Sequence, residues 1–254
     1  MAAKKTNMVG KRYSSSYGWC TIIEYIDTNR ITVQFDGLGS FITNCTFYNL
    51  KTGKVKNYYY PSVCGIGYIG DKNIEPPFVN GKITHCYDVW HNMITRCYDA
   101  KFVSQNLLYE DCSVDTEWHN FQNFAKWWKS EVLSDFKDSR GRSSAIDKNL
   151  MSKERRGNLY SEQTCTLLPE EIKIALITGD FRKYDLPSGV FSKGNCFSAR
   201  ISKYNKSIYI GSFSTPEEAS LAYQQEKRNY IKELAKKYES VLTSRVFNRL
   251  MEWK

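Results

Sequence analysis

The part of the sequence that most restricts the fold lies near the C-terminus, where three short β-prone runs precede a strong helix start. The runs are residues 189–192, 196–203 and 207–213, and short polar turns separate them. Ser214 or Thr215 then stands before Pro216-Glu217-Glu218, which is typical of a capped helix with acidic residues in its first turn. The pattern predicts a three-stranded sheet packed on one long helix.

The second of these runs separates apolar from polar side chains. Successive strand residues point to opposite faces, so Phe197, Ala199 and Ile201 share one face. Arg200 falls on the other face, between Ser198 and Ser202. A β-ribbon is narrow enough to enter the major groove of DNA. The candidate DNA-binding residues are therefore Lys193, Arg200, Lys203, Lys206 and Tyr209. On the plainer alternative, they are solvated charges on a structural sheet.

This segment resembles a known family. The run Tyr209-Ile-Gly-Ser-Phe-Ser-Thr-Pro-Glu-Glu-Ala219, with Ala222-Tyr223 after it, is similar to the Apetala-type DNA-binding domain of plant transcription factors and phage endonucleases. The resemblance covers about residues 187–232 and implies a sheet whose exposed face reads the major groove. Tyr209 stands where the family has a tryptophan, and Phe191 where plant members have an arginine. The base preference of those members is therefore not expected here.

The distribution of charge also favours a polyanionic partner. The chain of 254 residues has a net charge of +9. Residues 1–72 have 9 basic and 4 acidic residues, residues 73–178 have 13 and 15, and residues 179–254 have 14 and 8. Two basic ends around a slightly acidic middle fit nucleic acid, although a merely soluble basic protein would show the same excess. No apolar run approaches the roughly 18 residues of a membrane span, so no membrane partner is expected.

The first segment, residues 1–72, is predicted to be a small β domain, either a barrel or a meander. Its strand-like runs are residues 17–26, 30–35 and 41–47. Basic residues are interleaved with aromatic ones here: Lys4, Lys5, Lys11, Arg12, Lys54 and Lys56, with Tyr58, Tyr59 and Tyr60. These residues would either clasp a nucleic-acid strand or, for the tyrosines, close the edge of the barrel. The sequence leaves both readings open.

The middle segment, residues 82–178, begins with helical patterns and ends in a strand–loop–strand–helix order. Its residues resemble phage HNH-type endonucleases: Trp90-x-x-Met93-x-x-Arg96-Cys97-Tyr98, then Trp118 and Phe121, Ile146-Asp147-Lys148, Tyr160 to Cys165, and Leu168-Pro169-x-x-Ile172. An active HNH motif holds one divalent metal on a ββα element, with a histidine as general base. The resemblance makes Asp147 a metal ligand for Mg²⁺ or Mn²⁺.

The active motif is altered at two positions. Lys148 stands at the place of the histidine base, and Lys173 at a place where relatives tend to have asparagine. The base would then be Lys148 with a lowered pKa, or His85, His91 or His119 brought from elsewhere. Asp147 also has a structural alternative, as a cap or a partner of Arg140 or Arg142. The eight scattered cysteines lack close ligand pairs, which does not favour zinc, and are expected to be reduced and mostly buried.

Taken together, the sequence predicts an α+β protein with three modules: a small β domain at 1–72, an HNH-like domain with a ββα element at 82–178, and an Apetala-type domain at 187–254. The leading functional prediction is a phage-type homing endonuclease that cleaves double-stranded DNA with Mg²⁺ or Mn²⁺, using Asp147 and Lys148. The alternative is a catalytically inactive DNA-binding protein, acting as a repressor or as an inhibitor of a host defence system with a host protein partner. A third possible function is that of a module that binds acidic proteins. The resemblance implies the bacterial cytoplasm.

Overall fold

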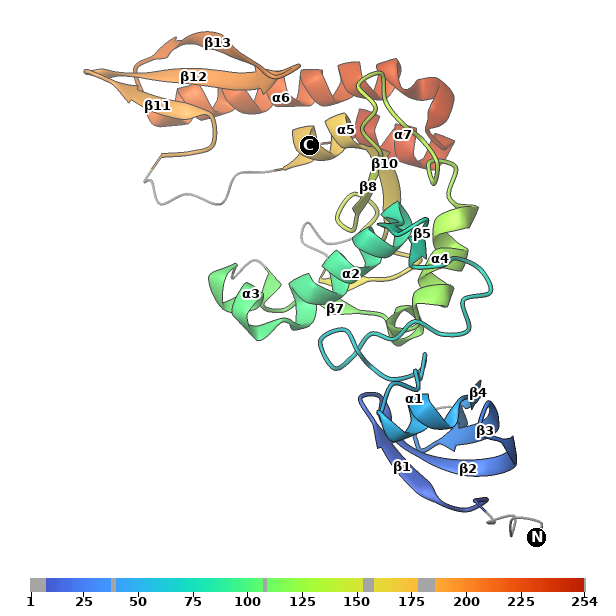
Figure 1. The fold of residues 1–254 in the computed structure, drawn as a ribbon. Helices are drawn as coiled ribbons and strands as arrows, with labels where there is room; N and C mark the ends of the chain where they lie inside the picture. Colours follow the sequence, from blue (N-terminus) through green and yellow to red (C-terminus); the bar gives the residue numbers. More distant parts are fainter. Residues whose placement is uncertain (1–7, 38–39, 107–108, 153–157, 178–185, 254) are drawn as a thin grey trace, which may run out of the picture. The chain divides into compact units, whose positions relative to one another are not determined.

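The protein is a mixture of helices and strands that divides into two compact units. In the computed structural model, residues 8–37, 40–106, 109–152, 158–177 and 186–253 are described. Unit 1 is Met1–Trp127 and unit 2 is Trp128–Lys254 (Figure 1). The predicted α+β class is confirmed. The boundary between the units falls inside the segment expected to be one HNH-like domain, and the division into three modules stays a prediction.

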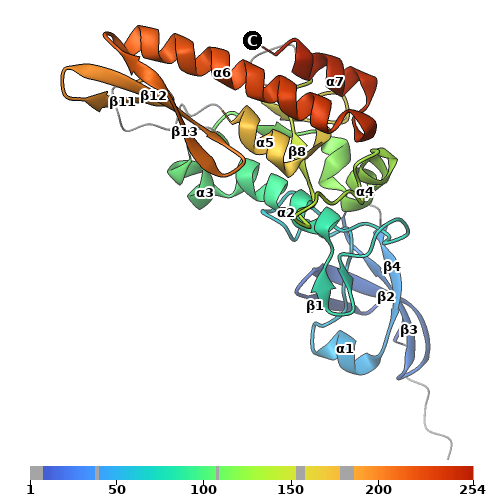
Figure 2. The ribbon, with the colours of Figure 1, turned by 90° about the horizontal axis from the view of Figure 1, so that it is seen from above.

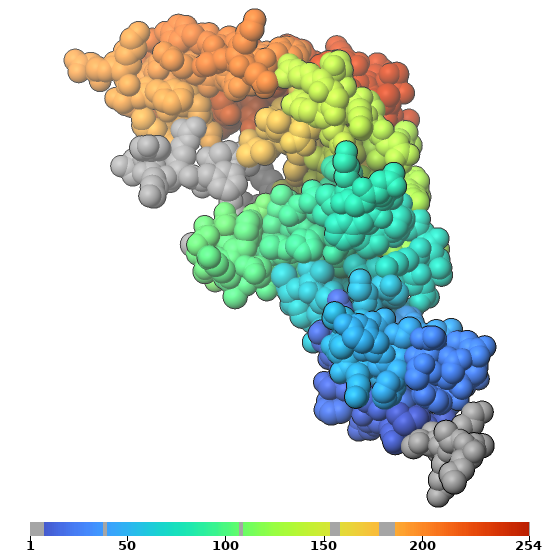
Figure 3. Space-filling model, in the orientation of Figure 1, coloured from blue at the N-terminus to red at the C-terminus, as the bar shows by residue number. Residues whose placement is uncertain are grey.

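Unit 1 begins with a four-stranded antiparallel meander. Its strands, in spatial order, are β1 (Arg12–Ser15), β2 (Gly18–Asp27), β3 (Arg30–Phe35) and β4 (Ile42–Cys45), and α1 (Phe47–Lys51) follows. Alternation along β3 buries Ile31, Val33 and Phe35 against Leu50 of α1. These residues and their neighbours pack into one body, drawn in blue in Figure 3. Of the two predicted forms, the described residues make the meander and no closed barrel.

The remainder of unit 1 is mainly helical and has an aromatic core. It contains β5 (Phe78–Val79), β6 (Lys82–Ile83), α2 (His85–Tyr98), α3 (Ala100–Gln105), β7 (Ser113–Val114), a 3-10 turn at Thr116–His119 and the start of α4 (Phe121–Ser130). Trp90 and Phe121 are fully buried and their rings lie 5.3 Å apart. The indole of Trp90 donates a hydrogen bond to the Trp118 carbonyl at 2.7 Å. These aromatic residues form the core, which is what their helical spacing favours.

Unit 2 contains the strand–loop–strand–helix order that the sequence predicts. β8 (Ser144–Asp147) pairs antiparallel with β10 (Thr166–Pro169), with Asp147 opposite Thr166, and α5 (Glu170–Leu176) follows at once. β9 (Leu159–Tyr160) lies in the connection between the two strands. Leu168 and Ile172 are fully buried in the main core of this unit. The element is therefore a short ββα unit.

The C-terminal part of unit 2 is a three-stranded sheet on a long helix. The sheet has the order β11 (Val190–Lys193), β12 (Cys196–Lys203) and β13 (Lys206–Phe213). The helix α6 (Pro216–Lys237) begins at Thr215, whose side chain forms a capping box with Glu218. After a 3-10 turn at Glu239–Val241, α7 (Ser244–Met251) packs on α6. Both ribbon views show the sheet beside the N-terminal half of α6 (Figures 1 and 2).

Gly189 allows the sheet to approach α6 closely, and we expect Gly189→Ala to destabilise unit 2. Its φ is +77°, and an added Cβ would overlap the ring of Tyr223 on α6. An alanine with this positive φ is strained, and its methyl group overpacks the contact with α6. Together the two effects should lower the free energy of unfolding by about 1–3 kcal/mol. Hydrogen exchange of the β11 and β12 amides measures this loss, with Gly194→Ala as control because its φ is also positive but its surroundings are open. Equal effects of the two substitutions would contradict the packing argument.

The eight cysteines form no disulfide in the described part of the chain, and five of them are buried. Among the described residues, no helix is both long enough and apolar enough to cross a bilayer.

Candidate nucleic-acid interface

The face of the C-terminal sheet that is turned away from α6 carries positive charge and no acidic side chain. Val190, Ala199 and Phe213 pack toward the helix. The opposite face presents Phe191, Arg200 and Tyr209, of which Phe191 is 49% and Tyr209 52% exposed. Residues 186–216 contain no Asp or Glu. An anionic ligand on this face would therefore meet no local like charge.

Arg200 is the central charged group of this face. It is exposed, and Tyr209 is its cross-strand neighbour. A β-bulge between Ala199 and Arg200 places one additional residue, Ile210, in β13. Ile210 packs inward on the core, so Arg200 and Tyr209 remain together on the outer face. The guanidinium has no hydrogen bond or ion pair within the described part of the chain, and it is available to a ligand.

Lys193 and Lys206 lie at opposite ends of the β-ribbon. Lys193 ends β11, and Lys206 begins β13 after a turn in which Tyr204 and Asn205 both have positive φ. The eight-residue strand β12 connects the two turns, which places these ends about 25 Å apart. Both lysines are exposed, and neither has an ion pair among the described residues. One cation therefore lies at each end of the ribbon and one, Arg200, in the middle.

Lys203 is a correction to the predicted set. It is 7% exposed and faces α6, where its ammonium lies 2.6 Å from Glu226 and 3.5 Å from Glu233. Burial would lower the pKa of Lys203, but the two carboxylates raise it above its usual value. Alternation explains the placement, because Lys203 shares the inward face of Ile201. Lys203 therefore stabilises the contact between sheet and helix and does not belong to the exposed face.

Ser198 also differs from its expected exposure. It lies on the outer face by register, opposite Phe191, but only 3% of its surface is exposed. Its hydroxyl lies 3.4 Å from the Phe191 carbonyl.

The second predicted site, at Asp147, is a buried ion pair. The Asp147 carboxylate is 3% exposed. One oxygen accepts hydrogen bonds from the backbone N–H groups of Asn149 and Leu150 at 2.9 and 2.7 Å. The other oxygen lies 2.6 Å from the ammonium of Lys173 on α5. The neighbouring Lys148 places its ammonium 5.5 Å from the ring centroid of Tyr160. Arg140 and Arg142, the alternative partners, contact Asp138 instead.

The residues around Asp147 do not fit the divalent metal that the HNH resemblance implies. Both oxygens of the carboxylate are already engaged, and the charged side chain that contacts it, Lys173, is cationic. Among the described residues, no three His, Cys, Asp or Glu side chains come together as a metal site. Mg²⁺ prefers several oxygen ligands, whereas the Lys173 ammonium at this carboxylate repels it. The described residues around Asp147 therefore support no metal-dependent step.

The three histidines proposed as outside bases all belong to unit 1 and have local contacts. The ring of His119 lies 3.2 Å from the Val114 carbonyl, and the ring of His91 lies 5.9 Å from that of Tyr87. His85 is the first residue of α2. These contacts fit structural roles for His91 and His119.

Sequence reasoning missed the partner of Asp147. In the sequence, Lys173 marks only a substitution in the motif, and its separation of 26 residues from Asp147 gives no signal of the pairing. Comparisons with family models, curated proteins and solved structures gave no match to this chain.

Proposed function

We propose that this protein binds double-stranded DNA through the outer face of its C-terminal sheet and does not cleave it at Asp147. The observation that carries the proposal is the acid-free outer face of the sheet, on which Arg200 has no partner among the described residues. Exposed Lys193 and Lys206 lie at the two ends of the ribbon, Lys206 at the turn, opposite the inward-facing Lys203. This arrangement supports the DNA-binding alternative, in the role of a repressor or of an inhibitor of a host defence system.

The geometry of the ribbon suggests how each residue would act. A two-stranded ribbon fits the major groove, which is about 12 Å wide. Arg200, on the middle of the ribbon, would donate to a base edge, since a planar guanidinium matches guanine O6 and N7. Lys193 and Lys206, at the ends, would contact phosphates, which position the protein without reading sequence. Phe191 and Tyr209 would pack beside Arg200 against sugars or bases.

The endonuclease prediction is favoured by one observation only, the ββα unit of β8, β10 and α5. The same unit argues against cleavage, because Lys173 neutralises the carboxylate that would hold the metal. A protonated lysine at position 148 also cannot accept a proton from water. The DNA-binding function is therefore better supported than the nuclease.

Replacing Arg200 by alanine should weaken duplex DNA binding by about 1–3 kcal/mol and relax preference at one base position. The measurement is fluorescence anisotropy with a labelled duplex that the wild type binds. Arg245→Ala is the matched control, since Arg245 is exposed on α7 and away from the sheet. Equal affinity of the Arg200 and Arg245 variants would show that the outer face is not the interface.

The two end lysines should affect salt dependence more than sequence preference. In Lys193→Gln/Lys206→Gln, the slope of log affinity against log salt should become less steep by about 2, because each lost phosphate contact changes it by about 0.9. An unchanged slope in this variant would remove both lysines from the proposed interface.

A further inference from the structure

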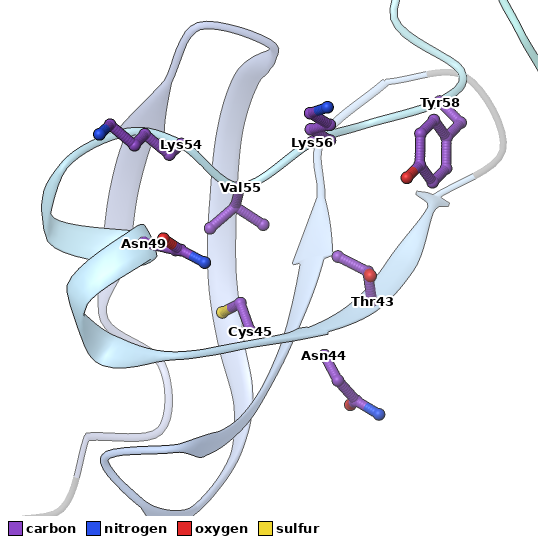
Figure 4. Close-up of a pocket in the computed structure, with 8 residues that line it drawn as sticks. All are labelled: Thr43, Asn44, Cys45, Asn49, Lys54, Val55, Lys56 and Tyr58. Carbon is purple, nitrogen blue, oxygen red and sulfur yellow. The ribbon is translucent and has the colours of Figure 1, made fainter. Parts of the chain in front are cut away.

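A polar groove lies at the edge of the N-terminal meander, far along the chain from the C-terminal sheet. It has a volume of about 260 Å³ and is lined by residues of β4, α1 and the segment that follows α1 (Figure 4). The lining residues are Thr43, Asn44, Cys45, Asn49, Lys54, Val55, Lys56 and Tyr58. This volume is below the roughly 300–1,000 Å³ of pockets for drug-sized ligands. The groove therefore suits a narrow chain or a small group.

Two lysines form the rim of the groove because exposure alternates along residues 54–57. Lys54 and Lys56 are exposed, whereas Val55 and Asn57 are buried. In Figure 4, Val55 points toward Cys45 while Lys54 and Lys56 point away from it on either side. Alternate residues of an extended chain are about 6–7 Å apart. The two ammonium groups can thus reach successive anionic groups of one linear ligand.

The positive charge of this region is not balanced within its own segment, and the carboxylate near its edge is that of Glu24 on β2, which shares the Thr32 hydroxyl with Asn44. Residues 37–70 contain Lys51, Lys54 and Lys56 and no Asp or Glu. Lys51 and Lys54 lie over the rings of Phe47 and Tyr48, at 5.8 and 5.7 Å from the ring centroids. Aromatic contacts position an ammonium group but leave its full charge. A phosphate here would meet cations and no carboxylate from its own segment.

The other groups of the groove also suit a sugar–phosphate chain. Thr43 and Asn49 supply neutral hydrogen-bonding groups to the lining, whereas Asn44 points to the other side of β4 (Figure 4), where its amide oxygen accepts from the Thr32 hydroxyl. The thiol of Cys45 adds no negative charge, since burial raises its pKa. Outside the lining, Tyr48 is 66% exposed, and the ammonium of Lys54 lies over one face of its ring, which leaves the other face for an unpaired base. Grooves that combine lysines with exposed aromatic rings are typical of proteins that bind single strands.

We propose that this groove binds the sugar–phosphate backbone of a single-stranded nucleic acid, with Lys54 and Lys56 on successive phosphates. The site is separate from the sheet face to which duplex binding is assigned, so each of the two can fail without the other.

The test uses the full chain and a fluorescein-labelled oligothymidylate of 12 nucleotides, which cannot form a duplex. In Lys54→Gln/Lys56→Gln, the dissociation constant at 50 mM salt should rise about tenfold, and the log–log salt slope should become less steep by about 1.4, or 0.7 per phosphate. Lys82→Gln/Lys101→Gln is the control, because both lysines are exposed in unit 1 outside the groove. It should bind the oligonucleotide as the wild type does.

Two further arms identify the ligand and separate the sites. Inorganic pyrophosphate should compete only at far higher concentration than the oligonucleotide. Competition at equal concentration would mean a small-anion site and overturn the proposal.

A second variant separates the groove from the sheet face: Lys193→Gln/Lys206→Gln should keep single-strand affinity while losing duplex affinity. If single-strand binding is absent in the wild type, or follows the sheet lysines and not Lys54 and Lys56, the groove is not the site.

Discussion

Glu171→Ala is expected to lower the free energy of unfolding of unit 2 by about 2–4 kcal/mol, because it removes a buried carboxylate that ties α5 to the end of α6. Glu171 is 6% exposed. One of its oxygens accepts hydrogen bonds from the Lys237 ammonium at 2.6 Å and from the Tyr238 hydroxyl at 2.7 Å. Alanine would leave the buried Tyr238 hydroxyl without this acceptor, and solvent around Lys237 keeps the loss below that of a fully buried pair.

The measurement is hydrogen exchange of amides in α5 and α6, since a chain of two units need not unfold in one transition. Glu239→Ala is the control, because Glu239 is exposed in the turn after α6. Equal protection in the two variants would show that the three-residue cluster does not hold the helices together.

The cluster of Glu171, Lys237 and Tyr238 also makes the stability of unit 2 depend on pH. Burial alone would raise the pKa of Glu171, but Lys237 and Tyr238 hold it below its usual value of 4.5. A carboxyl with a lowered pKa stabilises the fold at higher pH, and this contribution is lost as the pH falls below 4.5 through the folded-state pKa. The hydrogen-exchange protection of the α5 and α6 amides in the wild type should therefore fall as the pH decreases below 4.5. In Glu171→Ala the same protection should change less with pH.

The elements that the sequence predicts well are those determined by neighbouring residues. The turn at Tyr204 and Asn205 needs positive φ at both positions, and Asn tolerates that backbone. Thr215 and Glu218 are three residues apart, so the capping box is visible in the sequence. Strand alternation likewise placed Arg200 outward correctly. In each case the physical cause acts within a few residues.

The sites were harder to predict, because long side chains choose partners that are distant in sequence. The sequence makes Lys203 a candidate DNA contact, yet it pairs with Glu226 and Glu233 on α6. The HNH resemblance makes Asp147 a metal ligand, yet Lys173 reaches it from the next helix. A motif specifies where a carboxylate stands along the chain. Whether that carboxylate is open to a ligand depends on which cation the fold brings against it.

Asp147→Ala is expected to cost unit 2 about 3–5 kcal/mol, the largest loss of any single change considered. The substitution removes the acceptor for two backbone N–H groups and leaves the Lys173 ammonium, whose side chain is 27% exposed, without its partner. Asp135→Ala, on an exposed aspartate of the same unit, is the control. Thermal unfolding and hydrogen exchange of β8 and α5 amides measure the loss.

The charge pair itself is isolated by a double-mutant cycle. The cycle uses Asp147→Asn, Lys173→Met and the two substitutions combined. Lys173→Met leaves a buried carboxylate unpaired and should also destabilise, whereas Asp147→Asn/Lys173→Met should recover part of the loss, because neither charge remains. Duplex DNA affinity of the folded fraction should stay unchanged in all three variants, since the sheet face is untouched. Three results together would contradict this account: Mg²⁺ stabilises the wild type, Asp147→Ala abolishes that stabilisation, and the wild type cuts plasmid DNA. The carboxylate would then exchange Lys173 for the metal, and the protein would be a nuclease.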